Sequence, residues 1–278
     1  MDLPHMKKPY LNFATAPPME AQAGEFVVLG RSGHLFTRNL EKEDKDFSME
    51  KYHNGECDSY SYLYHENFSY YQFDATGCDY LRYGCRIDSG MKVLDIGANI
   101  GVFARAAVLR GASKVYCFEP MTPTYRCLEL NAQFAPEIIE TFKLGVSDKS
   151  ESTTFQIHTD YTHNGGGQMT EINPFLSNVV HSETCALIDI RAIFCDKIWG
   201  DVDFLKIDIE GAEEIVLKAL PDAALQRLVC IAAEFHSHTP EFDIFQENFI
   251  QRCQNFGFKS FVLYHGDGHL RTINLWKN

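Results

Sequence analysis

Short apolar runs recur from residue 93 to the C-terminal end, and most are bounded by glycine, proline or charged residues. Runs of this length with such boundaries are typical of strands that are buried on both faces of a sheet. The pattern predicts strands within residues 93–101, 114–120, 138–144, 153–158, 186–190, 203–210, 228–233, 258–264 and 271–277.

Most segments between these strands have apolar residues at the spacing of a helix. Phe242, Phe245, Phe249 and Cys253, for example, recur at steps of three and four residues, which indicates a helix with one buried stripe. Helices are predicted at residues 102–110, from Thr122 onward, at residues 191–199, after Gly211 and around residues 242–253. The alternation predicts an α/β fold with a doubly wound, mostly parallel sheet, helices on both faces and a final hairpin that adds an antiparallel strand.

The first 88 residues do not follow this alternation. Residues 1–24 show no clear period and predict a loosely held arm, whereas residues 24–39 predict two short strands around a turn. Residues 52–83 are rich in aromatic side chains, which form either a lid over a pocket or a cap packed on the main domain. We therefore expect an N-terminal arm and aromatic-rich cap over residues 1–88 and the main domain over residues 89–278. The aromatic residues are Tyr60, Tyr62, Tyr64, Phe68, Tyr70, Tyr71, Phe73, Tyr80 and Tyr83.

The composition of the chain bears on its compartment and its partners, but it does not identify a function. No apolar run among the 278 residues approaches the roughly 20 residues of a membrane-spanning helix, so we expect no membrane partner. The nine cysteines form no CxxC pair, which predicts reduced thiols and a cytoplasmic protein. The net charge of -13 argues against a nucleic-acid partner, because phosphate binding needs a basic surface. The composition does not decide whether the protein forms a homo-oligomer.

The stretch VLDIGANIG, residues 93–101, predicts a strand that ends in a ligand-binding turn. Gly97, Asn99 and Gly101 form this turn, but the middle glycine of a dinucleotide fingerprint is missing. Asp95 would repel a pyrophosphate and could pair, directly or through water, with a cationic ligand. Glu119 ends the next strand, where a carboxylate accepts both ribose hydroxyls. These features favour S-adenosylmethionine over a nicotinamide cofactor.

The following strand ends in GVSD, residues 145–148. If this end lies beside the first two strands, Val146, Ser147 and Asp148 are candidates to face the adenine of the cofactor.

The stretch from residue 203 to 220, DFLKIDIEGAEEIVLKAL, carries candidate chemistry. If residues 203–210 form a strand, Lys206, Asp208 and Glu210 point to one face. Charges on a face that is normally covered are costly unless they converge on a polar site at the carboxyl end of the strand. The alternative is a buried ion pair between Lys206 and Asp208 that serves only the fold.

A second pair of acid–base residues, Glu234 and His236, follows the apolar run of residues 228–233. These two side chains share a face, just past a strand that we expect next to the preceding one. A carboxylate and a histidine at the end of a strand favour a functional site over a structural histidine.

The ordered set VLDIGANIG, FEP, GVSD, LIDI, FLKIDIEGAE and AEFH closely resembles the FkbM family of S-adenosylmethionine-dependent methyltransferases over about residues 91–240. The resemblance implies the class I methyltransferase fold, a seven-stranded sheet with an antiparallel last strand. It also implies methylation of a hydroxyl group, commonly on a sugar or a natural product.

A hydroxyl needs a general base or a metal to attack a sulfonium methyl group at neutral pH. The hypothesis is that Asp208 or His236 takes the proton, while Lys206, Glu210 and Glu234 orient the acceptor or tune the base; Asp208 is also expected to contact the cofactor. A divalent cation such as magnesium, held by Asp208, Glu210 and Glu234, is a variant of this hypothesis. The rivals are a catalytically silent S-adenosylmethionine-binding scaffold and a methyltransferase that acts on a nitrogen or a macromolecule.

Overall fold

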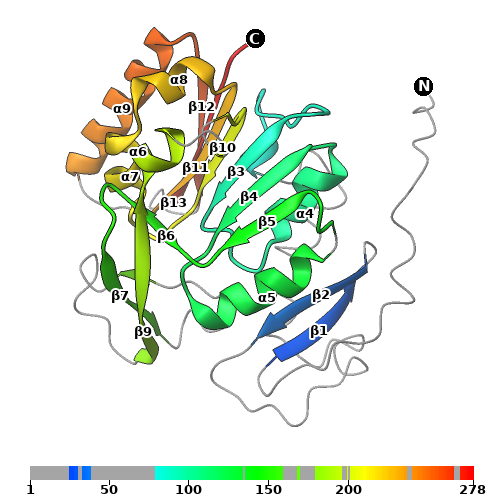
Figure 1. Cartoon of the computed structure of the whole chain (residues 1–278). Coiled ribbons are helices and arrows are strands. Elements are labelled where there is room, and N and C mark those ends of the chain that lie inside the picture. Colours follow the sequence, from blue (N-terminus) through cyan, green and yellow to red (C-terminus); the bar gives the residue numbers. More distant parts are fainter. Residues whose placement is uncertain are drawn as a thin grey trace.

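The computed structural model describes residues 25–30, 33–38, 79–133, 135–158, 168–169, 179–195, 199, 201–236, 240–265 and 270–278. A seven-stranded sheet of order β12-β13-β11-β10-β3-β4-β5 forms its centre (Figure 1). The strand β13 pairs antiparallel with both of its neighbours, and the remaining pairs are parallel. This arrangement confirms the predicted mostly parallel sheet with an antiparallel last strand. Its strands are β3 (Lys92–Ile96), β4 (Lys114–Phe118), β5 (Ile139–Phe142), β10 (Phe204–Ile207), β11 (Cys230–His236), β12 (Lys259–His265) and β13 (Leu270–Trp276).

Helices cover both faces of the sheet, as the alternation of apolar patterns predicts (Figure 1). The faces have separate apolar cores, one built with α4 and α5 and the other with α6, α7, α8 and α9. The predicted stripe on α9 is buried, with Phe242, Phe245, Phe249 and Cys253 at most 8% exposed. The helices are α4 (Val102–Leu109), α5 (Thr122–Ala132), α6 (Ile190–Cys195), α7 (Glu213–Ala219), α8 (Asp222–Arg227) and α9 (Pro240–Asn255).

A smaller sheet of order β6-β9-β7-β8 lies beside α7. It consists of β6 (Gly145–Ser147), β7 (Ser152–His158), β8 (Gln168–Met169) and β9 (Val179–Asp189). The prediction that GVSD ends a strand of the main sheet is therefore wrong. The chain leaves β5 at Phe142, and β6 pairs with β9 instead.

Several predicted boundaries differ from the structure. The strand predicted at residues 203–210 ends at Ile207, so Asp208 and Glu210 lie in the following loop. Glu210 has a φ of +56°, which a strand residue does not adopt. Conversely, β11 continues to His236 because it pairs with β13 along its whole length.

The N-terminal predictions are only partly within the described residues. The two short strands are present as the antiparallel hairpin of β1 (Glu25–Gly30) and β2 (Gly33–Arg38), which contacts α5. The arm of residues 1–24 and the aromatic residues from Tyr60 to Phe73 lie outside the described residues. Tyr80 belongs to the short 3₁₀ helix η3 (Asp79–Leu81), and Tyr83 stacks on Phe261 at 3.5 Å between ring centroids. These two aromatic side chains pack on the main domain.

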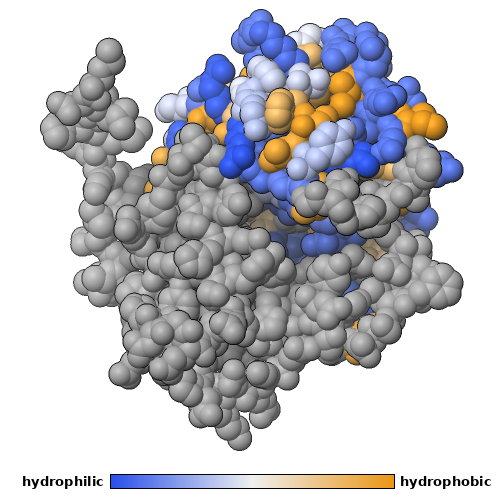
Figure 2. Space-filling view, turned by 180° about the vertical axis from the view of Figure 1, so that it is seen from behind, coloured by the Kyte–Doolittle hydropathy of each residue, from blue (hydrophilic) through white to orange (hydrophobic). Residues whose placement is uncertain are grey.

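None of the helices in the described ranges is long and apolar enough to span a bilayer. Seen from behind, the described surface is mostly hydrophilic, and its apolar side chains gather in an interrupted patch (Figure 2). Among the exposed large apolar residues are Ile244 and Tyr264. Apolar surface that is interrupted in this way does not by itself indicate a binding partner.

Candidate functional site

The glycine turn after β3 is shaped by close contact with the loop after β10. Gly97 has a φ of +73°, and a Cβ atom there would lie 1.7 Å from the backbone oxygen of Asp208. Only glycine permits this approach. Gly101, with a φ of +88°, directly precedes α4. The predicted cofactor turn and the predicted acid–base loop therefore touch each other.

Glu119 is fixed at the end of β4 by backbone donors. Its side-chain oxygens accept hydrogen bonds from the backbone N–H of Asn99 at 3.2 Å and of Met121 at 3.1 Å. Asn99 itself is held in the left-handed region, with a φ of +51°, which asparagine tolerates better than most residues. The structure thus brings Glu119, Asn99 and the glycine turn together, as the sequence predicts.

Asp95 and Lys206 lie beneath the glycine turn rather than in it. Asp95 has no exposed surface, and its Oδ1 atom is 3.3 Å from the Lys206 ammonium. Lys206 also donates a hydrogen bond to the Gly97 carbonyl at 2.6 Å. Burial alone would lower the pKa of Lys206, but Asp95 and Asp208 outweigh it and raise that pKa. Lys206 therefore acts as a buried cation that ties the turn to β10.

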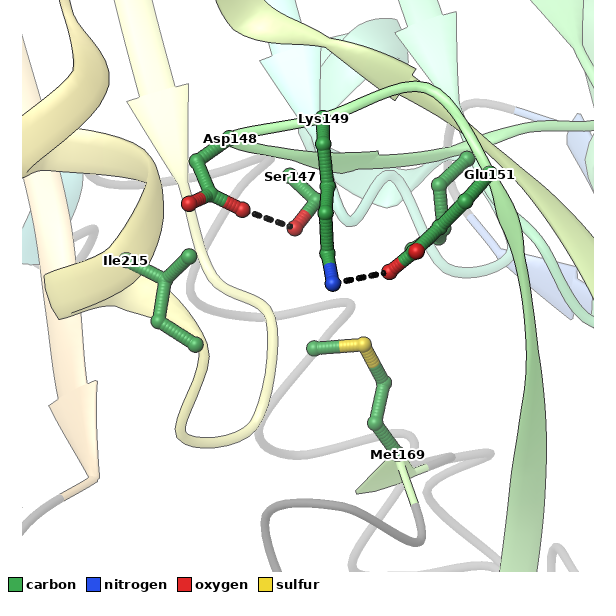
Figure 3. A pocket seen from close by; sticks show the side chains of 7 residues that line it. Ser147, Asp148, Lys149, Glu151, Met169 and Ile215 are labelled. Atoms are coloured by element: carbon green, nitrogen blue, oxygen red, sulfur yellow. Dashed lines mark hydrogen bonds and ion pairs between the residues drawn. The ribbon is translucent and has the colours of Figure 1, made fainter.

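Val146 and Ser147 are both 4% exposed and belong to β6. Ser147 and Asp148 line a pocket of about 330 Å³ between the smaller sheet and α7 (Figure 3). Ile215 and Met169 bring apolar side chains to this pocket from α7 and β8, and Lys149 pairs with Glu151 at 2.8 Å on its wall. The pocket thus combines apolar side chains with a polar edge.

The predicted acid–base residues converge at the carboxyl ends of β10 and β11. His236 Nε2 lies 3.6 Å from Glu210 Oε2 and 3.7 Å from Glu234 Oε1. Asp208 Oδ2 lies 3.6 Å from the Lys206 ammonium. The structure therefore joins four of the five predicted catalytic side chains in one cluster, and Lys206 supports it from below.

Two residues that the sequence did not assign to the site complete this cluster. The Tyr80 hydroxyl donates a hydrogen bond to Asp208 at 3.0 Å and also contacts Glu234 Oε2. Glu213, in the first turn of α7, lies 3.1 Å from His236 Nδ1. The sequence analysis does not single out Glu213, and it names Tyr80 only as one of many aromatic residues. Neither carries a local signal for the site, because their partners lie far away in the chain.

Glu213 also holds the loop that carries Glu210. Its carboxylate is fully buried and accepts hydrogen bonds from the backbone N–H of Ile209 at 3.1 Å and of Gly211 at 3.0 Å. The left-handed backbone of Glu210 lies between these two anchored residues. Backbone strain of this kind is common at functional sites, so this loop is a candidate functional loop.

Negative charge predominates in the cluster, and the pKa values of its members reflect this. Burial raises the pKa of Glu210 to about 7 and that of Glu234 to about 7. Burial alone would lower the pKa of His236, but Glu213 and Glu210 outweigh it and raise that pKa well above its usual value. The surrounding carboxylates therefore favour the protonated imidazole over the neutral form that could take a proton.

Asp208, Glu210 and His236 each offer one ligand atom, and these atoms lie within 4.8 Å of one another. Two carboxylates and an imidazole are a donor set that divalent cations accept. The set differs from the predicted one because the structure groups His236, in place of Glu234, with the two acidic residues.

Among families of known proteins, the methyltransferase FkbM domain matches residues 95–260, which make up more than half of the chain. The AMB antimetabolite synthetase AmbE of Pseudomonas aeruginosa is 31% identical over 189 residues, which cover 56% of this chain and 9% of that protein. The 31-O-demethyl-FK506 methyltransferase FkbM of Streptomyces tacrolimicus is 26% identical, with coverage of 56% and 70%. The hexuronic acid methyltransferase AglP of Haloferax volcanii is 28% identical, with coverage of 54% and 58%. The match thus spans a small part of AmbE and more than half of the other two proteins.

Proposed function

The chain belongs to the FkbM methyltransferase family, and from this premise we propose that it transfers the methyl group of S-adenosylmethionine to a hydroxyl group of a sugar or natural-product small molecule. The contact between Gly97 and Asp208 carries this proposal, because it puts the turn expected to bind the cofactor directly against the acidic cluster. Methyl transfer is an in-line displacement that requires the acceptor oxygen and the sulfonium methyl to be held together. The names of two relatives, an FK506 methyltransferase and a hexuronic acid methyltransferase, support the acceptor class.

In this proposal the cofactor lies along the carboxyl ends of β3 and β4. Glu119 accepts the ribose hydroxyls, and Gly97, Asn99 and Gly101 provide the close backbone approach. The adenine occupies the pocket of Ser147 and Asp148, where Met169, Leu187 and Ile215 supply apolar contact for a planar base. Val146 supports this pocket from β6. Asp95 is buried and paired with Lys206, so it acts on the cofactor indirectly, by holding the Lys206 ammonium against the glycine turn, or through a water molecule.

Asp208 is our candidate for the general base. Its backbone touches the glycine turn, and its side chain is 28% exposed, so an acceptor can reach it. His236 is the weaker candidate, because its raised pKa favours the protonated imidazole, which cannot accept a further proton. Glu210 and Glu234 then orient the acceptor hydroxyl, and protonated His236 stabilises their charge.

A divalent cation such as magnesium remains a variant of this proposal. Asp208, Glu210 and His236 would hold it, and its charge would polarise the acceptor oxygen. Thorough chelation tests the variant: loss of turnover that returns on adding MgCl₂ or MnCl₂ supports it, and full activity in chelator excludes it.

Binding and transfer are tested separately. Calorimetric titration with S-adenosylmethionine, S-adenosylhomocysteine and NAD should show binding of the two adenosyl compounds alone. Incubation with methyl-labelled S-adenosylmethionine and a panel of sugars, polyketide alcohols, amines, protein and RNA then identifies the acceptor class. Binding without transfer to any acceptor would favour the silent scaffold, and label on an amine or macromolecule would replace the hydroxyl proposal.

A further inference from the structure

Tyr80 lies outside the residues that the family model matches, yet its side chain is only 3% exposed and its hydroxyl points into the acidic cluster. We propose that Tyr80 is a positioning residue of the transfer site, which holds the carboxylates of Asp208 and Glu234 together. This inference rests on the proposed function, and it adds a residue from the segment before the matched domain to the site.

The ring of Tyr80 is fixed by its surroundings. It packs edge-to-face on Phe103, with ring centroids 5.8 Å apart, and the Lys206 ammonium lies 5.4 Å from its centroid. The backbone of η3 is anchored as well, because Asn274 of β13 donates a hydrogen bond to the Asp79 carbonyl at 2.9 Å. A phenol held on both sides in this way has little freedom to turn its hydroxyl elsewhere.

The hydroxyl meets carboxylates from two different strand ends. Asp208 follows β10 and Glu234 lies in β11, and the Tyr80 oxygen contacts both side chains. Two carboxylates that contact the same hydroxyl oxygen lie close enough to repel each other, and Glu210 adds further negative charge. A shared hydroxyl donor offsets that repulsion and fixes the rotamers of both groups. The Lys206 ammonium lies 3.6 Å from the same Asp208 oxygen, Oδ2, that accepts the hydrogen bond from Tyr80.

The consequence concerns catalysis rather than cofactor binding. Asp208 must face the acceptor hydroxyl, whereas the predicted cofactor contacts at Glu119 and Asn99 do not involve Tyr80. Loss of the hydroxyl should therefore lower kcat and leave the affinity for S-adenosylmethionine unchanged. A tyrosine whose hydroxyl served only to stabilise the fold would show the reverse: a lower melting temperature with normal turnover.

The test is Tyr80→Phe in the full chain, which removes the hydroxyl and keeps the ring. The matched control is Tyr125→Phe, because Tyr125 on α5 also makes a hydroxyl contact, to Thr141 Oγ1 at 3.2 Å, beside β5 at the far edge of the sheet. We expect kcat of Tyr80→Phe to fall about tenfold or more, as for loss of a hydrogen bond to a charged group, with the Kd for S-adenosylmethionine within twofold of wild type. The control should keep wild-type kcat.

Wild-type kcat in Tyr80→Phe, or an equal loss in the control, would overturn the proposal. If the wild-type chain methylates none of the acceptors, the proposed function fails, and crystal structures of wild type and Tyr80→Phe decide the positioning role alone. In those structures the Asp208 and Glu234 carboxylates should move apart in the variant. Unchanged carboxylate positions would overturn the proposal independently of any activity.

Discussion

The glycine turn with Glu119 and the acidic cluster touch each other at Gly97 and Asp208, but they are built differently. Glu119 accepts its hydrogen bonds from backbone N–H groups of its own neighbourhood, Asn99 and Met121. In the cluster, the carboxylates of Asp208, Glu210 and Glu234 instead contact side chains, namely those of Tyr80, Lys206 and His236. Glu213 differs from these three because it also accepts backbone N–H groups. Glu119 thus has hydrogen-bond donors before any ligand binds, whereas the acidic cluster holds several carboxylates close enough to repel one another.

This difference fits the two tasks that we propose. A cofactor site benefits from rigid backbone donors and acceptors, which need no rearrangement on binding. A site that takes a proton benefits from carboxylates whose pKa lies near neutrality, and burial raises those of Glu210 and Glu234 to about 7. Substitutions within one region should therefore change either cofactor binding or turnover. Substitutions at the contact between Gly97 and Asp208 should change both.

The largest effect is expected at that contact. Gly97→Ala puts a Cβ atom 1.7 Å from the Asp208 oxygen, so both loops must move, and binding of S-adenosylmethionine and kcat should each fall by about 100-fold or more. Calorimetry and a transfer assay measure the two losses. Gly257→Ala is the control, because Gly257 has a similar φ of +86° with nothing within 4 Å. Normal binding in Gly97→Ala would mean that the regions are not coupled.

Asp208→Asn tests the acidic cluster alone. The amide keeps the shape of the side chain and removes its proton affinity, so kcat should fall about 100-fold or more while cofactor affinity persists. The exposed Asp201→Asn, which only loses an ion pair to Lys92, provides a matched control. Unchanged turnover would remove Asp208 as the base and transfer the role to Glu210 or Glu234.

Glu119→Gln tests the other region. The amide loses the charge that accepts backbone and ribose donors, so the Kd for S-adenosylmethionine should rise about 10-fold to 100-fold. At saturating cofactor, kcat should stay close to wild type. Equal losses in Kd and kcat would contradict the division of labour between the two regions.

The smallest effect is a pH dependence of the acidic cluster. As pH rises through about 7, Glu210 and Glu234 lose their protons, and both carboxylates can then accept a hydrogen bond from the acceptor hydroxyl that we propose they orient. In chelator, kcat/KM should therefore rise about tenfold between about pH 6 and about pH 8. The Kd for S-adenosylmethionine, measured over the same range, should change little. A flat rate profile would contradict the assignment of these two carboxylates.

The sequence by itself determined the seven strands of the main sheet, the antiparallel last strand, and the positions of Glu119 and the glycine turn. It placed residues 145–148 in the wrong sheet and did not predict α8 or β8. The features that it determined depend on short-range patterns: apolar periodicity, and glycines at positions where the backbone turns with positive φ. The sequence also located Asp208, Glu210, Glu234 and His236 at the ends of apolar runs. Parallel strands bring such ends to one edge of a sheet, so their meeting followed from the fold class.

Only the tertiary structure decided how the charges are used. Strand β10 ends at Ile207, where the Asp208 carbonyl packs on Gly97, and Lys206 lies between the buried Asp95 and the half-buried Asp208. The contacts of Tyr80 with Asp208 and Glu234 join residues 128 and 154 positions apart. The apolar periodicity of the sequence predicts which face of a strand or helix a residue occupies. It does not predict which residue far away in the chain will contact it. Ion pairing and hydrogen bonding in a low-dielectric interior are set by that partner.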